Sequence, residues 1–246
     1  RVFPVFISAM RTALPFSIAV VAVLLPLGVS AQTLRYPSTE FWSKPENVNA
    51  FLGTYGFLSP LEPVPTAEER TLFRSVVEQL KLEGGRATAV QMLTSALKPE
   101  STASVDFTLA NLHAEMGQLD QAIANYRNAI RKEPNFLRAY KNLGLFLCQK
   151  GSFDEAVPAL VKAANLGAAD SVTYGLLGLC YLNTGRLLAA EAAYRNAVVF
   201  DPATRDWKLG LARSLIEQQK FTEAIALLDE ILKTRPDDVT LWLALT

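Results

Sequence analysis

Side chains able to do acid–base, nucleophilic or metal chemistry are few and scattered in this sequence. The single histidine, His113, has no carboxylate pair or serine around it in the spacing of a catalytic triad. The two cysteines, Cys148 and Cys180, form no metal-ligand spacing with His113. No phosphate-binding glycine loop, Cys-x-x-Cys or His-Glu-x-x-His motif occurs. The sequence therefore predicts a protein that is not an enzyme and that needs no cofactor or metal ion.

Composition and charge narrow the class of protein further. Half of the 246 residues are hydrophobic, and only 13 are glycine and 13 proline, which favours helices over sheets or disorder. The formal net charge is zero, so bulk charge attracts neither nucleic acid nor an anionic membrane. Several carboxylates have the spacing of solvated helix faces: Asp154, Glu155, Glu191, Asp229 and Glu230. We expect no nucleic-acid partner.

An internal repeat organises most of the chain. The string Tyr-Arg-Asn-Ala at 126–129 returns at 194–197, a displacement equal to two periods of about 34 residues. The unit at 171–204 shows the repeated pattern most fully, with Tyr174, Leu177, Gly178, Tyr181, Ala190, Tyr194, Ala197 and Pro202. This pattern resembles the tetratricopeptide repeat, in which each unit is a pair of helices.

The resemblance implies an all-α fold, an α–α superhelix in which stacked helical hairpins bury a common core. We expect this solenoid to cover 70–246, with full units at 103–136, 137–170, 171–204 and 205–238. A degenerate unit is expected near 70–102, where the inward-facing places hold Phe73, Val76, Val77 and Leu80. The segment 239–246 begins a truncated unit without a second helix or polar cap, so we expect the full-length protein to continue with further repeats.

The segment 1–31 has the order of a secretory signal peptide. A basic residue precedes an apolar run at 16–27, and small residues follow at 29–31. We expect cleavage between Ala31 and Gln32 and export to the periplasm or the extracellular space, as in bacterial exported proteins. The stretch 1–9 precedes the first methionine and is interpreted as extraneous upstream sequence.

A retained membrane anchor at 12–31 is the alternative to cleavage, because this stretch carries no charged residue. Pro15, Pro26 and Gly28 argue against it, since helix breakers near both ends shorten the helix that could span a bilayer. Contact with a membrane is expected only if this segment stays uncleaved.

The segment 32–69 is a region rich in proline and aromatic residues between the signal and the solenoid. We interpret it as a linker that packs on the first hairpin as an N-terminal cap, because terminal solenoid units need covering. The alternative is a strap that lies in the concave groove like a ligand, or a motif that binds a partner.

The resemblance also assigns structural roles to the histidine and the cysteines. His113 occupies a place where the repeat usually has an aromatic residue, so we interpret it as a packing residue. Cys148 and Cys180 fall on the first helices of adjacent units, in places that differ by two, which turns side chains apart by about 200 degrees on a helix. We therefore expect buried free thiols, with a disulfide in an oxidising compartment as the alternative.

In the family that the sequence resembles, the concave wall is built from fixed places of each first helix. These places form the predicted protein-binding face: Phe107, Asn111, Arg138, Lys141, Leu145, Gln149, Val172, Leu179, Leu182, Asn183, Asp206, Leu209, Arg213 and Glu217. The centre of this face is apolar, with basic residues on one side and acidic ones on the other, which suits an amphipathic or extended peptide of mixed charge.

A chaperone-type clamp for a C-terminal carboxylate, known in some relatives, is not expected. Asn111 and Asn142 match two of its places, but Phe107, Val172 and Leu176 replace the basic residues. The resemblance thus implies a non-catalytic scaffold that binds a protein or peptide outside the cytoplasm. Two alternatives remain: an accessory region of a larger exported enzyme or assembly complex whose catalytic part lies beyond Thr246, and a solvated face that binds nothing itself.

Overall fold

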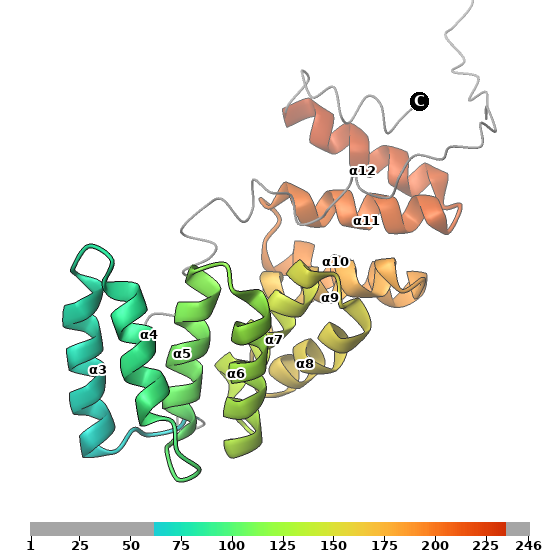
Figure 1. The fold of residues 1–246 in the computed structure, drawn as a ribbon. Helices are drawn as coiled ribbons and strands as arrows, with labels where there is room; N and C mark the ends of the chain where they lie inside the picture. The colour runs from blue at the N-terminus through green and yellow to red at the C-terminus, as the bar shows by residue number, and fades with distance from the viewer. Residues whose placement is uncertain (1–61, 235–246) are drawn as a thin grey trace, which may run out of the picture.

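The computed structural model describes residues 62–234, and this part of the chain is built from helices (Figure 1). Among the described residues ten helices occur and no strand, which confirms the predicted all-α solenoid. They are α3 (Ala67–Leu80), α4 (Gly85–Ala96), α5 (Ala103–Glu115), α6 (Leu119–Lys132), α7 (Leu137–Lys150), α8 (Phe153–Asn165), α9 (Ser171–Asn183), α10 (Leu187–Phe200), α11 (Arg205–Glu217) and α12 (Phe221–Thr234). The segments 1–61 and 235–246, with the expected signal, most of the linker and the truncated last unit, lie outside the described residues.

Consecutive helices pair as hairpins, and the hairpins stack side by side in an arc from α3 to α12 (Figure 1). The helices α5, α7, α9 and α11 begin at the same place of successive repeat units, and so do their partners α6, α8, α10 and α12. The helix α9 contacts its partner α10 and also the first helices of both neighbouring units, α7 and α11. The first helices therefore lie together along one side of the stack.

The turn between the two helices of a unit requires a left-handed backbone. Gly117, Gly151 and Gly185 occupy this turn with φ of 72°, 83° and 72°, a conformation that a residue without a Cβ adopts at little cost. The same turn of the last described hairpin has Gln219 at φ 62°. The spacing of the glycines thus sets where these hairpins reverse, and the turn between α11 and α12 forms even though it has a glutamine at this place.

Close approach of the two helices of a unit depends on a small residue facing a large one. The ring of Tyr194 on α10 lies between Gly178 of α9 and Gly210 of α11, where an added Cβ would come within 2.7 Å and 2.3 Å of ring atoms. Tyr194 is buried, and the equivalent places of other units hold the buried Tyr126 and Leu160. One large side chain per unit therefore fills the space that small residues leave open.

The first hairpin follows the repeat less closely. Val76 is buried with Ala89 and Leu93 of α4, whereas Val77 is 52% exposed. Phe73 and Leu80 are only partly buried against this cluster. The expectation that all four apolar residues of α3 face inward is wrong for Val77. The helix α3 packs Val76 against α4, and Val77 lines an open pocket between α3 and α5 instead.

Candidate protein-binding groove

The structure divides the predicted concave-face residues by their exposure. The exposed ones are Gln149, Asn183 and Glu217. The half-buried ones are Arg138, Lys141, Val172, Asp206 and Arg213. The buried ones are Phe107, Asn111, Leu145, Leu179, Leu182 and Leu209. A partner that touches this face without rearranging it would meet the first two groups.

The buried apolar members of the set are part of the hydrophobic core. Phe107, Leu145 and Leu179 belong to one large cluster that runs through the central units. Leu182 packs with Tyr194 and Trp207, and Leu209 packs with residues of α12. Substitution of these side chains would disturb folding together with any binding, so they are poor probes of the face.

Asn111 and Asn142, the two residues that match the carboxylate clamp of some relatives, are committed to each other. The hydroxyl of Tyr126 donates to Oδ1 of Asn111 at 2.5 Å, and Nδ2 of Asn142 lies 3.3 Å from both of these oxygens. All three side chains are buried. The amides therefore link two adjacent units from inside, through the bonds that Nδ2 of Asn142 donates to Asn111 and Tyr126.

Arg138 is the charged centre of the face. Its guanidinium forms an ion pair and a hydrogen bond with the carboxylate of Glu62 and lies 5.2 Å from the centroid of the Phe107 ring. The side chains of Arg138 and Glu62 are 15% and 6% exposed. A charge pair that is largely shielded from water and stacked on an aromatic ring holds its geometry well.

Glu62 belongs to a stretch that we call the 62–66 segment, and this segment crosses the first helices. The Ser104 hydroxyl donates to the carbonyl of Pro63 at 3.0 Å, and Arg70 donates to the carbonyl of Pro65 at 2.7 Å. Thr66 then caps α3 in a reciprocal bond with Glu69. An extended piece of the protein's own backbone is thus held by α3, α5 and α7 at once.

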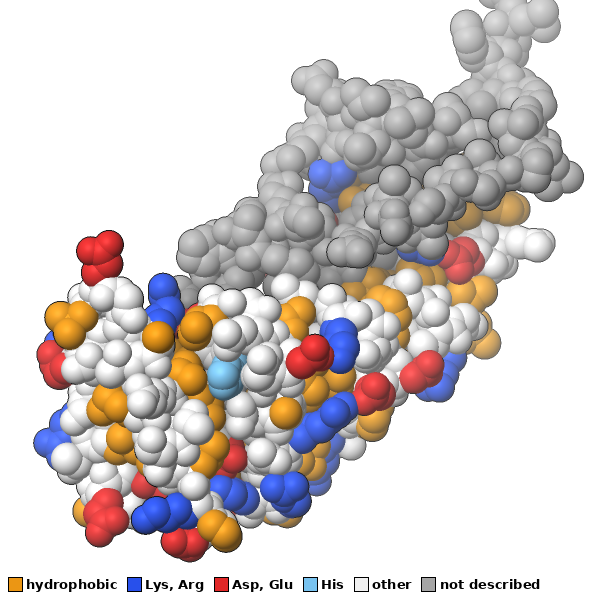
Figure 2. All heavy atoms as spheres, viewed as in Figure 1, with side chains coloured by type: hydrophobic (Ala, Val, Ile, Leu, Met, Phe, Trp, Pro, Cys, Tyr) orange, Lys and Arg blue, Asp and Glu red, His pale blue; other side chains and the backbone are white. Residues whose placement is uncertain are grey.

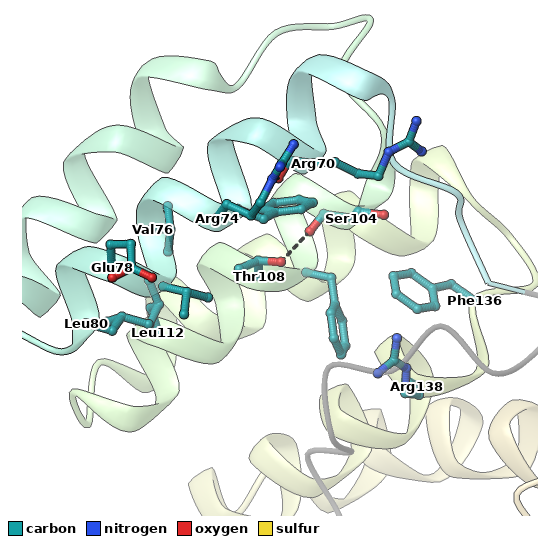
Figure 3. Close-up of a pocket in the computed structure, with 13 residues that line it drawn as sticks. Arg70, Arg74, Val76, Glu78, Leu80, Ser104, Thr108, Leu112, Phe136 and Arg138 are labelled. Carbon is teal, nitrogen blue, oxygen red and sulfur yellow. Dashed lines mark hydrogen bonds between the residues drawn. The ribbon is translucent and has the colours of Figure 1, made fainter.

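A pocket of about 710 Å³ lies between α3 and α5, next to this segment (Figure 3). Its lining is mostly apolar and includes Val76, Leu80, Leu112 and Phe136, with Arg70, Arg74 and Arg138 at its margin. In Figure 3, Val76, Leu80 and Leu112 lie toward one end of the pocket together with Glu78, and the three arginines and Phe136 lie toward the other. The pocket therefore has a mostly apolar end and a basic end.

Other charges of the face are paired locally. Lys141 forms an ion pair with Asp170 at 2.6 Å, and Asp170 also caps α9 by accepting from the backbone of Thr173. On α11, Arg213 pairs with Glu217 at 2.9 Å. Basic and acidic side chains are intermingled on the face shown in Figure 2, so no field of a single sign dominates that side of the molecule.

An ion-pair cluster joins the third and fourth units. Hydrogen bonds from Lys220, which precedes α12, and from Arg195 and Gln218 hold the carboxylate of Glu191 on α10. The bond from Lys220 is the main cause that lowers the pKa of Glu191 to about 2. The cluster is a link between repeats.

The cysteines and the histidine have structural positions. Both thiols are free and buried, as predicted, and burial raises the pKa of Cys148. The expectation that they turn apart is wrong, because their sulfur atoms lie 3.0 Å from each other. Nδ1 of His113 is 2.6 Å from Oε1 of Gln118. Within the described range, no cluster of three or more metal-binding side chains occurs.

Sequence reasoning missed the arginines of α3 and the role of Glu62. Arg70 and Arg74 are four positions apart, the spacing that puts two side chains on one helix face. That spacing could have indicated a basic helix face, although the repeat pattern describes only the apolar positions and does not point to it. The contact of Glu62 with Arg138 spans 76 residues, and no local pattern indicates it.

Comparisons with known proteins agree with the fold. Sequence profiles of the tetratricopeptide repeat match residues 107–171 and 181–246. Cellulose synthase operon protein C of Pseudomonas fluorescens (strain SBW25) is 33% identical over 137 residues, which are 52% of this chain and 11% of that protein. This chain thus spans a small part of that relative.

Solved structures of repeat proteins share the architecture. MamA of Desulfovibrio magneticus RS-1 superposes with a TM-score of 0.62 at 19% identity, covering 71% of this chain and 99% of that one. YrrB, described as a TPR protein with an unusual peptide-binding site, gives a TM-score of 0.57 at 21% identity and covers 71% of this chain and 87% of its own. At such identities the likeness shows the fold alone.

Two profile matches that together cover more than half of the chain, and ten helices in stacked hairpins among the described residues, define the class of protein. The chain belongs to the tetratricopeptide-repeat family. Repeats of this kind support a protein–protein interaction scaffold, and the family is generally non-catalytic.

Proposed function

We propose that this chain is an exported, non-catalytic scaffold that binds a peptide or protein segment on the side formed by its first helices. One observation carries the proposal. This side already holds an extended backbone, since Ser104, Arg70 and Arg138 bind two carbonyls and a carboxylate of the 62–66 segment. A surface that binds main-chain carbonyls and an acidic side chain together has the chemistry of peptide recognition.

The partner-facing surface is assigned to the exposed members of the predicted set and their half-buried neighbours. Gln149, Asn183 and Glu217 occupy the same place of three successive units, each at or next to the C-terminal end of a first helix. A partner that follows the stack would therefore pass all three. Arg138 adds a charge that a competing carboxylate can reach by displacing Glu62.

Site-directed photo-crosslinking tests this proposal. A photoreactive amino acid placed at Gln149, Asn183 or Glu217 should cross-link to a partner in cells that express the protein. Matched exposed positions on the second helices, Gln121, Ala192 and Ala226, should not. Equal cross-linking from both sets, or none from the first, would contradict the assignment of the binding side.

Arg138→Glu is a second test, because it places two carboxylates together and should weaken capture of that partner. Leu179→Asp, at a site only 6% exposed, is expected to destabilise the fold as well, so Asn183→Asp is the cleaner variant for the third unit.

Export rests on the signal-like segment at 1–31, which lies outside the described residues. No helix in the described range is long and apolar enough to cross a membrane. Sequencing the N-terminus of the protein after expression in a bacterium tests the proposal: a mature terminus at Gln32 supports export with cleavage, and an intact segment at 12–31 supports a membrane anchor.

A second candidate is an accessory repeat region of a larger exported assembly. The similarity to a protein of a cellulose synthase operon favours it, because the match covers only 11% of that relative. The complete open reading frame decides between the two: a catalytic domain after Thr246 would favour the accessory role, and further repeats alone would favour the scaffold.

A further inference from the structure

The pocket between α3 and α5 changes in chemistry along the helices. Arg70 and Ser104 lie in the first turns of α3 and α5, Arg138 is near the N-terminus of α7, and Arg74 lies one turn after Arg70 in the middle of α3. Val76, Val77, Leu80 and Leu112 lie in the C-terminal halves. Helix N-termini carry a partial positive charge, which adds to the arginines at the basic end.

Two guanidinium groups at the basic end remain available for a ligand. Within residues 62–234, Arg74 donates only to the carbonyl of Arg70 and the hydroxyl of Thr71, and Arg70 donates to the carbonyl of Pro65. Among the described residues, neither forms an ion pair with a carboxylate. Both side chains are exposed. Glu78, the one acidic residue of the lining, pairs instead with Lys81 at 2.7 Å.

The protein itself shows which chemistry this region accepts. Glu62 puts a carboxylate on Arg138, and the carbonyl of Pro63 accepts from Ser104, at the edge of the same pocket. A segment with one carboxylate, that of Glu62, is therefore already bound beside the unfilled part. The charge complementarity that holds it is available again at Arg70 and Arg74.

We propose that the pocket between α3 and α5 binds an extended segment of a partner protein, with an apolar side chain between Val76, Leu80 and Leu112 and a carboxylate on Arg70 and Arg74. The inference rests on the proposed peptide-binding function and assigns it a subsite and a ligand chemistry. The path from Arg74 or Arg70 to Leu80 along α3 is about 9 to 15 Å. An extended peptide covers about 3.3 Å per residue, so the apolar and acidic residues of the ligand are about three to five positions apart.

The test uses the full chain and a defined probe. The probe is a hexapeptide with two leucines, two serines and two glutamates in that order, labelled with fluorescein at its N-terminus and amidated at its C-terminus. Two control peptides replace the glutamates with glutamines or the leucines with serines. Fluorescence anisotropy measures the dissociation constant of each peptide.

Arg74→Glu and Val77→Asp alter the two ends of the pocket at exposed positions, so the fold should persist. Their matched controls are Arg131→Glu on α6 and Val199→Asp on α10, both exposed and outside the pocket lining. We expect each pocket variant to weaken binding of the probe by about tenfold or more, because a charge-assisted bond or an apolar contact is replaced by repulsion or desolvation. The two controls should bind as the unchanged protein does, and circular dichroism should be the same for all.

Three results would overturn the inference: no binding of the probe by the unchanged protein, equal binding of all three peptides, or equal binding by pocket and control variants. Sedimentation tests one other occupant. If the unchanged protein forms a dimer and Arg74→Glu abolishes that dimer, a second copy of the chain occupies the pocket instead. Cross-linking at Gln149, Asn183 and Glu217 does not involve this pocket. The scaffold proposal can therefore stand if the pocket proposal fails.

Discussion

The hairpins α9–α10 and α3–α4 are both two-helix units, but α9–α10 lies within the stack and α3–α4 is the first described hairpin, and they differ in how completely they close. In α9–α10, Gly178 and Gly210 of the next unit let the ring of Tyr194 sit between first helices with no space left. In α3–α4, Val77 is exposed, Phe73 is partly buried, and a pocket separates α3 from α5. The repeat pattern thus specifies close packing of the helices, and a pocket is present where the first hairpin departs from this pattern.

The two hairpins also differ in how they are joined to the next unit. Glu69 of α3 accepts from the backbone and the hydroxyl of Thr102 at 2.7 and 2.8 Å. Glu191 of α10 is joined to Lys220 through an ion pair. The N-terminal junction thus has neutral donors on Glu69 and a longer ion pair of 3.6 Å between Arg86 and Glu115, whereas the C-terminal junction has an ion pair of 2.7 Å between Lys220 and Glu191.

Removing one large aromatic side chain from each hairpin should give the largest difference in stability between the two regions. We expect Tyr194→Ala to lower the free energy of unfolding by about 3 to 5 kcal/mol, since an aromatic ring is lost from a fully packed site. Phe73→Ala should cost about 1 kcal/mol, because that side chain already faces a cavity. Urea denaturation followed by circular dichroism measures both. Similar losses for the two variants would mean that the first hairpin is packed as tightly as the third.

A second pair of substitutions, one of which adds a methyl group, tests the same difference in packing between the two hairpins. Gly178→Ala places a Cβ 2.7 Å from ring atoms of Tyr194 and should destabilise the protein by about 1 to 3 kcal/mol. Val77→Ala, at the equivalent helix of the first hairpin, should change stability by less than about 0.5 kcal/mol because the side chain is exposed. The same denaturation experiment applies, and a neutral Gly178→Ala would show that α9 and α10 can move apart freely.

Acid should weaken the C-terminal link. The folded-state pKa of Glu191, about 2, is below its ordinary value of 4.5, so its contribution is complete above pH 4.5 and is lost as the pH falls toward 2. Solvent screens this link, and we expect Glu191→Gln to remove about 1 kcal/mol at neutral pH. The variant should then lose less stability than the unchanged protein between pH 4.5 and 2. Parallel pH profiles of unfolding would contradict the assignment.

A change of similar size is expected at the turns. Gln219→Gly should stabilise the last described hairpin by about 1 kcal/mol, because the left-handed backbone at φ 62° strains a residue with a Cβ. Gly185→Ala is the converse control and should destabilise by about 1 kcal/mol. Thermal unfolding monitored by circular dichroism compares them, and a destabilised Gln219→Gly would indicate that the glutamine side chain contributes more than its backbone loses.

Much of the fold follows from residues that are close in sequence. Helices, turns and buried positions can be identified from the sequence alone. The buried positions recur one period apart at Tyr126, Leu160 and Tyr194, and the turns recur at the glycines 117, 151 and 185. Helical periodicity and turn geometry are properties of a few consecutive residues, so they can be read along the chain. The same reasoning placed two free, buried cysteines correctly.

The candidate site required the tertiary structure. Cys148 and Cys180 lie on two helices that face each other, so the rotation between units brings together sulfurs that an angle on one helix would separate. Packing between distant residues also makes Asn111 and Asn142 a buried pair, brings Glu62 to Arg138 across 76 residues, and leaves a pocket between α3 and α5. The sequence alone therefore determined the repeating hairpin, because its signals are local. How one unit sits on the next, and hence which surfaces stay open, was decided only by packing between residues far apart in the chain.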